Sequence, residues 1–549
     1  MLRHLPPSNR PSINFNLGST AMAHSDKQVE IAKTYARLAK SLGRYPDNSE
    51  IKKAGMPRVR DHFGDIDQLR DLARELFPNH FADIVDPEYF NAEAYQALKE
   101  HVKKFKRFFI SCVVPGQPVD RDAMASVRTW CKKNKGTSLF LAANYGLLEL
   151  PADFVAENNI VFRDLKLNSN IWISAVKVDP KQIDPLASLD GIGQREGTMI
   201  IASPKQRMRP VANSNFKLPH IIQATGAITR PRYVAKTFLG KSSERRDYIA
   251  KAQHIMGGII VEIVDEKFYH FRQVQFDKDG SFIDLFTRYD EDGSELVTCE
   301  AVVQGDFHDG ETDADADAAA DELCKLGKPK YRVFHDFFNG HSISHHDKKK
   351  KVTQARKAGE HRLSLATELH NMKLTLQRKC KAAGREKFVM VRSNHDEFLD
   401  RYLEEGDFED QNRLLATQLQ VAAMEGKDPL KFAMETMGLK DNGRIIWLDR
   451  DQDFKVSARK IEIGAHGDLG ANGARGSSQG MLKAYGACTY GHCHYPEINH
   501  DAWSVGTSSR MDLDYKRGAS SWMHSHQVIY SNGSRQIINV INGKWRLEG

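Results

Sequence analysis

The sequence predicts an α/β protein in which strands end in metal-binding residues, preceded by a helical module. Short apolar runs that suit buried strands recur along the C-terminal half, and each is followed at once by aspartate, asparagine or histidine. Near the N-terminus, apolar residues instead repeat at spacings of three and four, which is typical of helices. A chain of 549 residues is too long to form a single hydrophobic core, so about three folded domains are expected.

Changes in these patterns place the domain boundaries. We expect a disordered tail over 1–25, a helical module over 26–95, an α/β domain of unassigned role over 96–296 and a metal-binding domain over 297–549. The tail mixes Pro, Asn, Ser and Gly and lacks the apolar core of a secretory signal. Seven scattered cysteines without paired spacing predict a reducing, cytoplasmic environment.

Composition narrows the class of protein. With 28% charged and 40% hydrophobic residues, the chain falls in the soluble globular class. It has no run of about eighteen apolar residues, so we expect no membrane span. The net charge of +7 favours nucleic acid as a partner only weakly, and the position of the charges matters more.

The helical module begins with an amphipathic helix that Gly43 ends. A turn follows, capped by Asp47 or Asn48, and a short helix then runs to Gly55. Another helix is expected to begin near Pro57, where proline is tolerated in a first turn. The apolar residues that define the first and the last helix are Ile31, Tyr35, Leu38 and Leu42, and Ile66, Leu69, Leu72 and Leu76.

Two fragments of this module, Leu42-Gly43-Arg44-Tyr45-Pro46 and His62-Phe63-Gly64, carry a resemblance. They resemble the homing-endonuclease-associated DNA-binding repeat, in which a Gly-Arg-x-Pro turn is followed by a helix closing in Phe-Gly. The resemblance implies a reading helix over 57–63, with Arg58, Arg60 and His62 facing DNA. The alternative is a three-helix module for dimerisation or protein docking.

The middle region shows both kinds of pattern. Apolar runs over 108–114 and 138–143 suit buried strands, and the helical pattern over 122–133 lies between them. We therefore expect a βαβ unit.

Five fragments of the last region hold the candidate metal ligands. Four of them follow the strand-like runs 301–303, 331–334, 388–391 and 461–463. Residues placed where strands end meet at one edge of a sheet, which is where open α/β folds carry their chemistry. The fragments are Gly305-Asp306-Phe307-His308, His335-Asp336-Phe337-Phe338-Asn339, Ser393-Asn394-His395-Asp396, Ala465-His466-Gly467-Asp468 and Gly491-His492-Cys493-His494.

These residue types suit a pair of divalent cations. Aspartate, asparagine and histidine bind Mn²⁺, Mg²⁺, Zn²⁺ or Fe²⁺. Two such ions about 3.5–4 Å apart activate water and neutralise phosphoryl oxygens, and one carboxylate must reach both. A histidine on the opposite side can protonate the leaving oxygen. The fragments therefore predict a dinuclear metal hydrolase.

In order, the fragments resemble the motifs of the calcineurin-like metallophosphoesterases: Asp-x-His, Gly-Asp-x-x-Asp, Gly-Asn-His-Asp/Glu, His and Gly-His-x-His. The resemblance implies a β-sandwich flanked by helices, with His395, supported by Asp396, as the acid beside the scissile phosphate. It also implies Asp306, His308 and His494 at the first metal, Asp336 as the bridge, and Asn394, His466 and His492 at the second metal.

Two departures from the motifs need attention. The second fragment has His335 in place of Gly and Asn339 in place of Asp, although the bridging aspartate is kept. The third fragment has Ser393 in place of Gly, at a close-packed loop position where a small side chain should fit.

The combination of a phosphoesterase site with this N-terminal module favours DNA as the substrate. It resembles the Mre-eleven and SbcD nucleases, which prefer Mn²⁺, and the pre-early host-DNA-degrading nucleases of tequintaviruses. The resemblance implies DNA hydrolysis in a bacterial cytoplasm, and it leaves room for a homo-oligomer or a phage or host protein partner. The alternatives are a phosphatase or nucleotide pyrophosphohydrolase with a docking module, and a DNA-binding regulator with a vestigial phosphoesterase domain.

Overall fold

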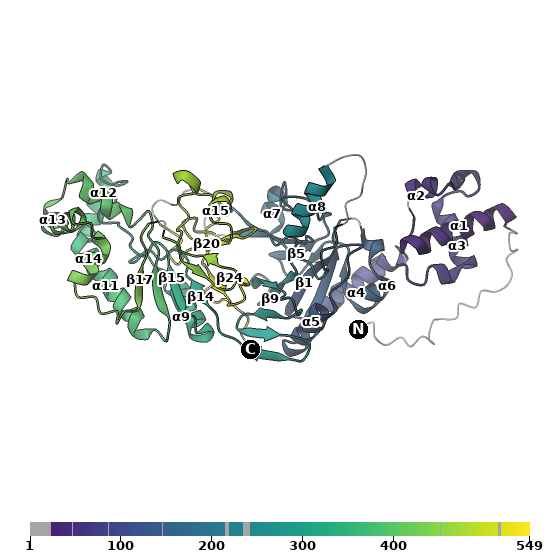
Figure 1. Cartoon of the computed structure of the whole chain (residues 1–549), viewed down its shortest axis with the longest axis horizontal. Coiled ribbons are helices and arrows are strands. Elements are labelled where there is room, and N and C mark those ends of the chain that lie inside the picture. Colours follow the sequence, from purple (N-terminus) through teal and green to yellow (C-terminus); the bar gives the residue numbers. More distant parts are fainter. Residues whose placement is uncertain are drawn as a thin grey trace.

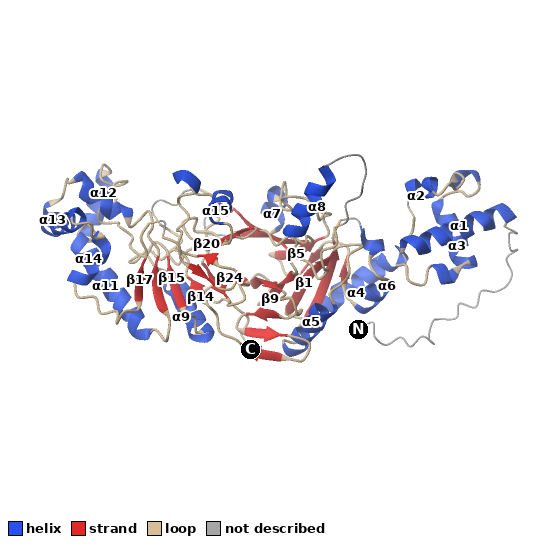
Figure 2. Ribbon diagram, in the orientation of Figure 1, coloured by secondary structure: helices blue, strands red, loops and turns tan. Residues whose placement is uncertain are grey.

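The structure is a computed structural model, and it describes residues 24–46, 48–85, 87–144, 146–214, 219–233, 242–450, 452–513, 516 and 518–548. The predicted tail up to residue 23 and the predicted cap Asp47 lie outside these residues. The molecule is elongated, with the N-terminal helices at one end and a group of C-terminal helices at the other (Figure 1). Sheets lie between them and helices flank the sheets (Figure 2), which confirms the α/β class.

The N-terminal module is helical, as predicted. Its elements are α1 (Asp26–Leu42), α2 (Asn48–Lys53), η1 (Val59–Asp61), α3 (Ile66–Leu76), η2 (Pro78–His80) and η3 (Pro87–Phe90). The side chain of Ser25 caps α1, and Gly43 ends the helix with a left-handed φ of 66°. Tyr35 of α1 and Leu69 of α3 are fully buried in the core that these two helices share.

The predicted reading helix over 57–63 is wrong. In its place the structure has η1, a single 3₁₀ turn whose residues are not buried. The segment lies between Gly55 and Gly64, and at its end Phe63 turns into the core of the module with 7% of its surface exposed. So short a segment cannot repay the cost of starting an α-helix unless packing along a whole face supports it.

The middle region contains the predicted βαβ unit. Strand β1 pairs in parallel with β2, and α5 connects them. The elements of this region are α4 (Ala92–Val102), β1 (Arg107–Val113), α5 (Arg121–Lys133), β2 (Thr137–Ala142), η4 (Gly146–Glu149), α6 (Ala152–Glu157), β3 (Ile160–Val161), β4 (Leu165–Lys166), β5 (Ile171–Ser174), α7 (Asp190–Glu196), β6 (Thr198–Ile201), β7 (Met208–Val211), β8 (His220–Ala224), α8 (Ser242–Ala252), β9 (Gly257–Ile263), β10 (Tyr269–Gln275), β11 (Phe282–Asp284), β12 (Thr287–Tyr289) and β13 (Ser294–Leu296).

The C-terminal region contains the strands predicted before the first four metal fragments. Its elements are β14 (Ala301–Val303), α9 (Ala314–Gly327), β15 (Tyr331–Phe334), α10 (Lys351–Gly359), α11 (Leu365–Ala382), β16 (Lys387–Met390), α12 (Glu397–Glu405), α13 (Asp410–Met424), α14 (Pro429–Thr436), β17 (Ile445–Trp447), β18 (Lys455–Val456), β19 (Ile461–Glu462), η5 (Ala471–Gly473), α15 (Ser478–Tyr485), β20 (Cys488–Tyr490), β21 (Glu497–Asn499), β22 (Ala502–Ser504), β23 (Ser525–Ile529) and β24 (Arg535–Asn539).

Two sheets of the C-terminal region pack face to face. One sheet, here called the C-terminal sheet, has the order β17-β16-β15-β14-β23-β24, and its first four strands are parallel. The other contains β18, β19, β20, β22 and β21. Val303 and Val389 of the C-terminal sheet share one apolar core with Ile461 of the other sheet. Helices α11 to α14 form a second core against the opposite face.

The second of these sheets continues into the middle region. Strand β21 pairs with β7, so one sheet, the shared sheet, runs β18-β19-β20-β22-β21-β7-β8-β6-β5-β4 across both regions. The boundary at 296/297 therefore stays a prediction. Among the described residues, no helix combines the length and the apolar character that crossing a bilayer requires.

Candidate metal centre

The five metal fragments come together at one edge of the two packed sheets. Three of them follow β14, β15 and β16 of the C-terminal sheet, and the other two follow β19 and β20 of the shared sheet. The hydrogen-bond ladder between the first two strands continues into their loops. The amide of Phe307 donates to His335 O at 3.0 Å, and the amide of His308 donates to Asp336 O at 2.8 Å. These bonds hold the first two fragments in a fixed register.

Four of the predicted ligands form a buried cluster. Asp306, His308, Asp336 and His494 each offer one ligand atom, and these atoms lie within 4.8 Å of one another. The Nε2 atoms of His308 and His494 are 3.1 Å apart. Nε2 of His494 lies 3.2 Å from Oδ2 of Asp306. These four possible ligand atoms lie close enough together to share one cation.

The three remaining predicted ligands form a second group that reaches Asp336 through His466. Nε2 of His466 is 3.3 Å from Oδ2 of Asp336, while Nε2 of His308 is 3.7 Å from the same oxygen. Oδ1 of Asn394 lies 3.0 Å from Nε2 of His466 and 3.1 Å from Nδ1 of His492. Asp336 therefore occupies the middle position between two groups of ligands.

Strained backbone conformations are concentrated in the site. His308, Asp336, His492 and His494 have φ angles of 49°, 48°, 69° and 58°, in the left-handed region that residues other than glycine rarely adopt. Each such conformation costs about 1–3 kcal/mol and persists only where the surrounding structure holds it. Four of the proposed ligands have such conformations. The fold therefore holds these side chains in place at a cost to its own stability.

Gly491 allows the last fragment to approach the first. A Cβ atom at this position would lie 2.1 Å from Oδ1 of Asp306 and 2.9 Å from the side chain of His335. Its amide donates to His466 O at 2.8 Å. Only glycine fits here, because any side chain would displace a proposed ligand.

The residues fit a divalent cation. Oδ1 of Asp306 and Oδ1 of Asp336 are buried and accept no hydrogen bond within the part of the chain that the structure describes. A buried carboxylate oxygen without a donor is costly, and a cation would satisfy it. The nitrogen and oxygen donors of this set suit Mn²⁺, Fe²⁺ and Zn²⁺.

The electrostatics of the cluster favour an ionised Asp336 and a neutral His308, whereas His466 is protonated at pH 7 and would have to lose its proton to bind a cation. Burial opposes the ionisation of Asp336, but the charges of His466 and His395 outweigh it and hold the pKa of the carboxyl well below its usual value. Burial lowers the pKa of His308 to about 3, so this imidazole is neutral at pH 7. Burial also lowers the pKa of His466, but Asp336 reverses this effect and raises it to about 9.

His395 lies beside the centre, but its support differs from the prediction. Its Nδ1 lies 2.7 Å from the backbone carbonyl of Asn339, and its ring packs on Phe398 with centroids 4.7 Å apart. The carboxylate of Asp396 instead accepts the amide of Ser393 at 2.9 Å. The expectation that Asp396 supports His395 is therefore wrong, because the short turn directs this carboxylate back to its own backbone.

Sequence reasoning missed two neighbours of the ligands. His335, noted only as a departure from the motif, is fully buried, and its Nδ1 lies 3.5 Å from Nδ1 of His466. Trp522 places its ring 4.3 Å from the ring of His494. Adjacency to the bridging aspartate could have indicated the first, whereas nothing in the local sequence indicates the second.

The predicted DNA contacts lie far from this centre in the elongated molecule (Figure 1). Arg58 and Arg60 are exposed, whereas His62 is partly buried and its backbone carbonyl accepts a bond of 2.8 Å from the side chain of Gln28. Arg44, from the motif of the resemblance, forms an ion pair with Glu50 at 2.6 Å and contacts Glu149 of the middle region at 3.4 Å.

Comparisons with known proteins add one relative. No family model matches the chain, and no solved structure matches it. The chain is 30% identical over 343 residues to Protein A1 of Escherichia phage T5. The match covers 59% of this chain and 59% of that protein, so it spans less than two thirds of the relative's length. This similarity supports the link to the tequintaviruses. It does not test the resemblance to the metallophosphoesterases, which depends on the motifs and the geometry of the site.

Proposed function

We propose that the chain is a metal-dependent nuclease that hydrolyses phosphodiester bonds in DNA. The observation that carries the proposal is the buried cluster of Asp306, His308, Asp336 and His494, extended by Asn394, His466 and His492. The proposal is supported by the order of these residues, which follows the order of the sequence motifs, and by their position after strands of two packed sheets.

Within this proposal, Asp306, His308 and His494 would hold one divalent cation, and Asp336 would be shared with a second. Two bound cations, with Mn²⁺ as the expected metal, would supply an activated water and neutralise charge on the phosphoryl oxygens. The residues that would hold the second cation are Asn394, His466 and His492.

His395 is the proposed acid for the leaving oxygen. Because Nδ1 is held by the carbonyl of Asn339 at 2.7 Å, Nε2 is the nitrogen that can donate a proton. Its ring lies 4.6 Å from that of His308, which places it next to the ligands without being one of them. Phe398 packs on the ring and limits its rotation.

DNA is the proposed substrate because two observations favour it. The sequence of the N-terminal module resembles a DNA-binding repeat, although residues 57–63 do not form its reading helix, and Protein A1 of Escherichia phage T5, to which this chain is similar, is a phage protein. We further propose that the protein degrades host DNA in the cytoplasm of an infected bacterium.

One experiment tests substrate and metal together. Purified protein is incubated with plasmid DNA, linear single-stranded DNA and a small aryl phosphodiester, each with Mn²⁺ and with EDTA. We expect Mn²⁺-dependent loss of both DNA substrates and slower turnover of the aryl diester. Hydrolysis of the aryl diester without any cleavage of DNA would contradict the nuclease assignment while leaving the metal centre intact.

A phosphatase or nucleotide pyrophosphohydrolase with a protein-docking module is the second candidate. The absence of a reading helix among the described residues 57–63 favours it, and so does the contact of Arg44 with the middle region. Release of phosphate from a nucleotide or phosphoprotein in the same assay would identify this function.

A further inference from the structure

The loop that carries Asp306 is held by side chains from two distant parts of the chain and by the neighbouring Gln304. It leaves β14 at Gln304 and turns through Gly305 before the ligand is reached. Loops normally satisfy their buried backbone groups with neighbouring backbone or water. Here several of these groups are bonded to buried side chains that belong to none of the five metal fragments.

Ser508 and Gln304 hold this turn from one side. The hydroxyl of Ser508 donates to Gly305 O at 3.0 Å, and the amide of Ser508 donates to Asp306 O at 2.8 Å. The side-chain amide of Gln304 in turn donates to the hydroxyl of Ser508 at 3.1 Å. Both side chains are fully buried. The two residues therefore fix the peptide that enters the ligand.

His526 of β23 holds the same turn from the other side. Its Nδ1 accepts the amide of Gly305 at 3.2 Å, and its Nε2 lies 2.9 Å from the carbonyl of Ala316 in α9. Both ring nitrogens are thus engaged with backbone, and the side chain is fully buried. This arrangement excludes the contact with a substrate phosphate that a histidine near the end of the chain would otherwise suggest.

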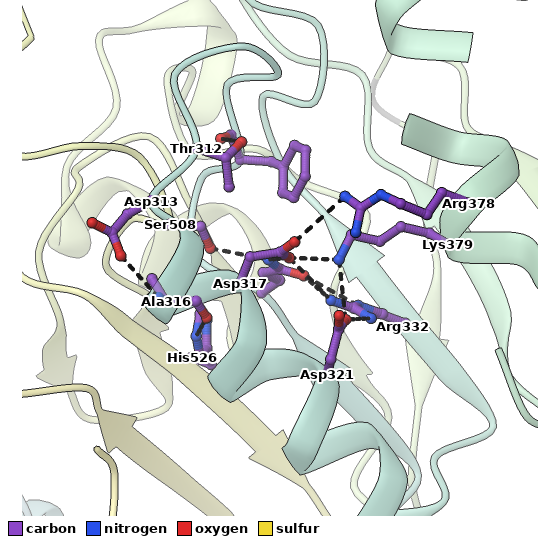
Figure 3. A network of polar contacts seen from close by, with 12 residues as sticks. Thr312, Asp313, Ala316, Asp317, Asp321, Arg332, Arg378, Lys379, Ser508 and His526 are labelled. Atoms are coloured by element: carbon purple, nitrogen blue, oxygen red, sulfur yellow. Dashed lines mark hydrogen bonds and ion pairs between the residues drawn. The ribbon is translucent and has the colours of Figure 1, made fainter. Parts of the chain in front are cut away.

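A network of charges formed by the buried residues Asp317, Arg332 and Lys379 and the more exposed Asp321 (Figure 3) anchors Gln304 through hydrogen bonds. Oε1 of Gln304 accepts bonds of 3.1 and 2.6 Å from Arg332, and its amide donates to Asp317 at 3.0 Å. Lys379 forms ion pairs of 2.5 Å with Asp317 and 3.0 Å with Asp321. These opposite charges satisfy one another, so the group acts as a rigid support for the amide that it holds.

We infer that Ser508, Gln304 and His526 are positioning residues that set the direction of Asp306 toward the metal centre. The inference rests on the proposed function, because it assigns a role to these residues through a proposed ligand. Residues that orient a metal ligand typically change metal affinity by about 10–100-fold when they are lost. Their effect should therefore appear in metal binding itself, before any catalytic step.

The test is a calorimetric titration of Mn²⁺ into the full-length protein and into Ser508→Ala. The substitution removes one hydroxyl and leaves the backbone bond to Asp306 in place. We expect the affinity for Mn²⁺ to fall by about 10–100-fold. Ser508→Cys keeps a side chain of similar size with only a weak donor, so its affinity should lie between the two. This second variant also provides a result if the alanine variant folds poorly.

Ser111→Ala is the matched control. Ser111 is also fully buried, and its hydroxyl donates to the carbonyl of Gly257 at 2.7 Å in the middle region. Both alanine variants should lose similar thermal stability in chelator, but only Ser508→Ala should bind Mn²⁺ more weakly. Equal Mn²⁺ affinity in parent, Ser508→Ala and Ser508→Cys would overturn the positioning role alone. A parent protein that binds no Mn²⁺ would overturn the metal centre and the proposed function with it.

Discussion

The candidate metal centre and the N-terminal module were both predicted from short motifs, but the structure agrees with the two predictions to different extents. All seven proposed ligands meet, although they are spread over residues 306–494. By contrast, the seven residues 57–63 do not form the expected helix. Ligands that follow strands are positioned by sheet topology, whereas a short helix depends on packing that its own sequence does not specify.

The two regions also differ in their electrostatics. The charges of the centre are buried, so their interactions are strong and little affected by salt. Arg58 and Arg60 are exposed, so any contact that they make with DNA is screened by salt. Substitutions in the centre should therefore change hydrolysis of every substrate, while substitutions in the module should change only the binding of long, charged substrates.

The largest expected effect is that of Asp336→Ala. This substitution removes the carboxylate that lies between both groups of ligands, with distances of 3.3 Å to His466 and 3.7 Å to His308. Hydrolysis of DNA and of a small aryl diester should both fall to the level of EDTA-treated protein, and bound metal should fall with them. Rates at several Mn²⁺ concentrations, together with elemental analysis, measure this.

Asp247→Ala is the control for that experiment. Asp247 is also a buried carboxylate, and it pairs with Lys181 in the middle region. This variant should keep both its metal and its activity. If Asp336→Ala hydrolysed either substrate at the parent rate in saturating Mn²⁺, the assignment of the bridging ligand would be wrong.

The next effect in size concerns His395→Ala. As a proton donor rather than a ligand, this residue should lower turnover by about 10²–10⁴-fold when removed. Metal content should remain close to that of the parent, because the ring of His395 is held by the carbonyl of Asn339 and packs on His308 and Phe398. Elemental analysis and the rate of hydrolysis, measured on the same variant, distinguish a proton donor from a ligand. A metal centre without bound metal in this variant would show that His395 is a ligand.

The sequence alone predicts some features of these sites and not others. The strands before the first four fragments, and the order of the ligands, follow from apolar runs and from residues placed at strand ends. The partner of His395 could not be predicted, because it is the backbone carbonyl of Asn339, which carries no side-chain signal. The contacts of Ser508 and His526 with Gly305 could not be predicted either, because these residues lie more than 200 positions from Gly305 in the sequence.

The shared sheet was not predicted either. Strand β21 pairs with β7 through Ile498 and Met208, two residues that no local pattern connects. Pairing between strands so distant in sequence is decided by the complete fold. The shared sheet therefore joins strands from both sides of the predicted boundary at 296/297, which stays a prediction.

A smaller effect is expected in the N-terminal module for the double variant Arg58→Ala and Arg60→Ala. If both side chains contact phosphates, log affinity for DNA should depend less steeply on log salt by about one to two units, since each contact adds about 0.9 to the slope. Binding titrations at three salt concentrations, in Ca²⁺, measure the slope. The same titration on the exposed pair Lys427→Ala and Arg413→Ala, in the distant C-terminal helices, controls for a general loss of charge. An unchanged slope in the first variant with a changed oligomeric state would favour the docking module.

The smallest effect is that of Asp65→Ala, which tests whether the module unfolds separately from the metal-binding region. The side chain of Asp65 caps α3 by accepting the amide of Gln68 at 2.9 Å. Loss of such a cap typically costs about 1 kcal/mol, which corresponds to roughly fivefold faster opening. Hydrogen exchange of peptides from α3 should therefore speed up by this factor, while peptides from β14 and β15 should be unchanged.

Asp67→Ala supplies the comparison for that last variant. Asp67 lies two residues after Asp65 in the first turn of α3, has 68% of its side chain exposed and pairs with Arg70 on the surface, so its loss should change exchange little. Faster exchange in β14 or β15 of Asp65→Ala would mean that the module and the metal-binding region open together. The contact between Arg44 and Glu149 would then transmit stability between the two regions, and the module could not be treated as an independent DNA-binding unit.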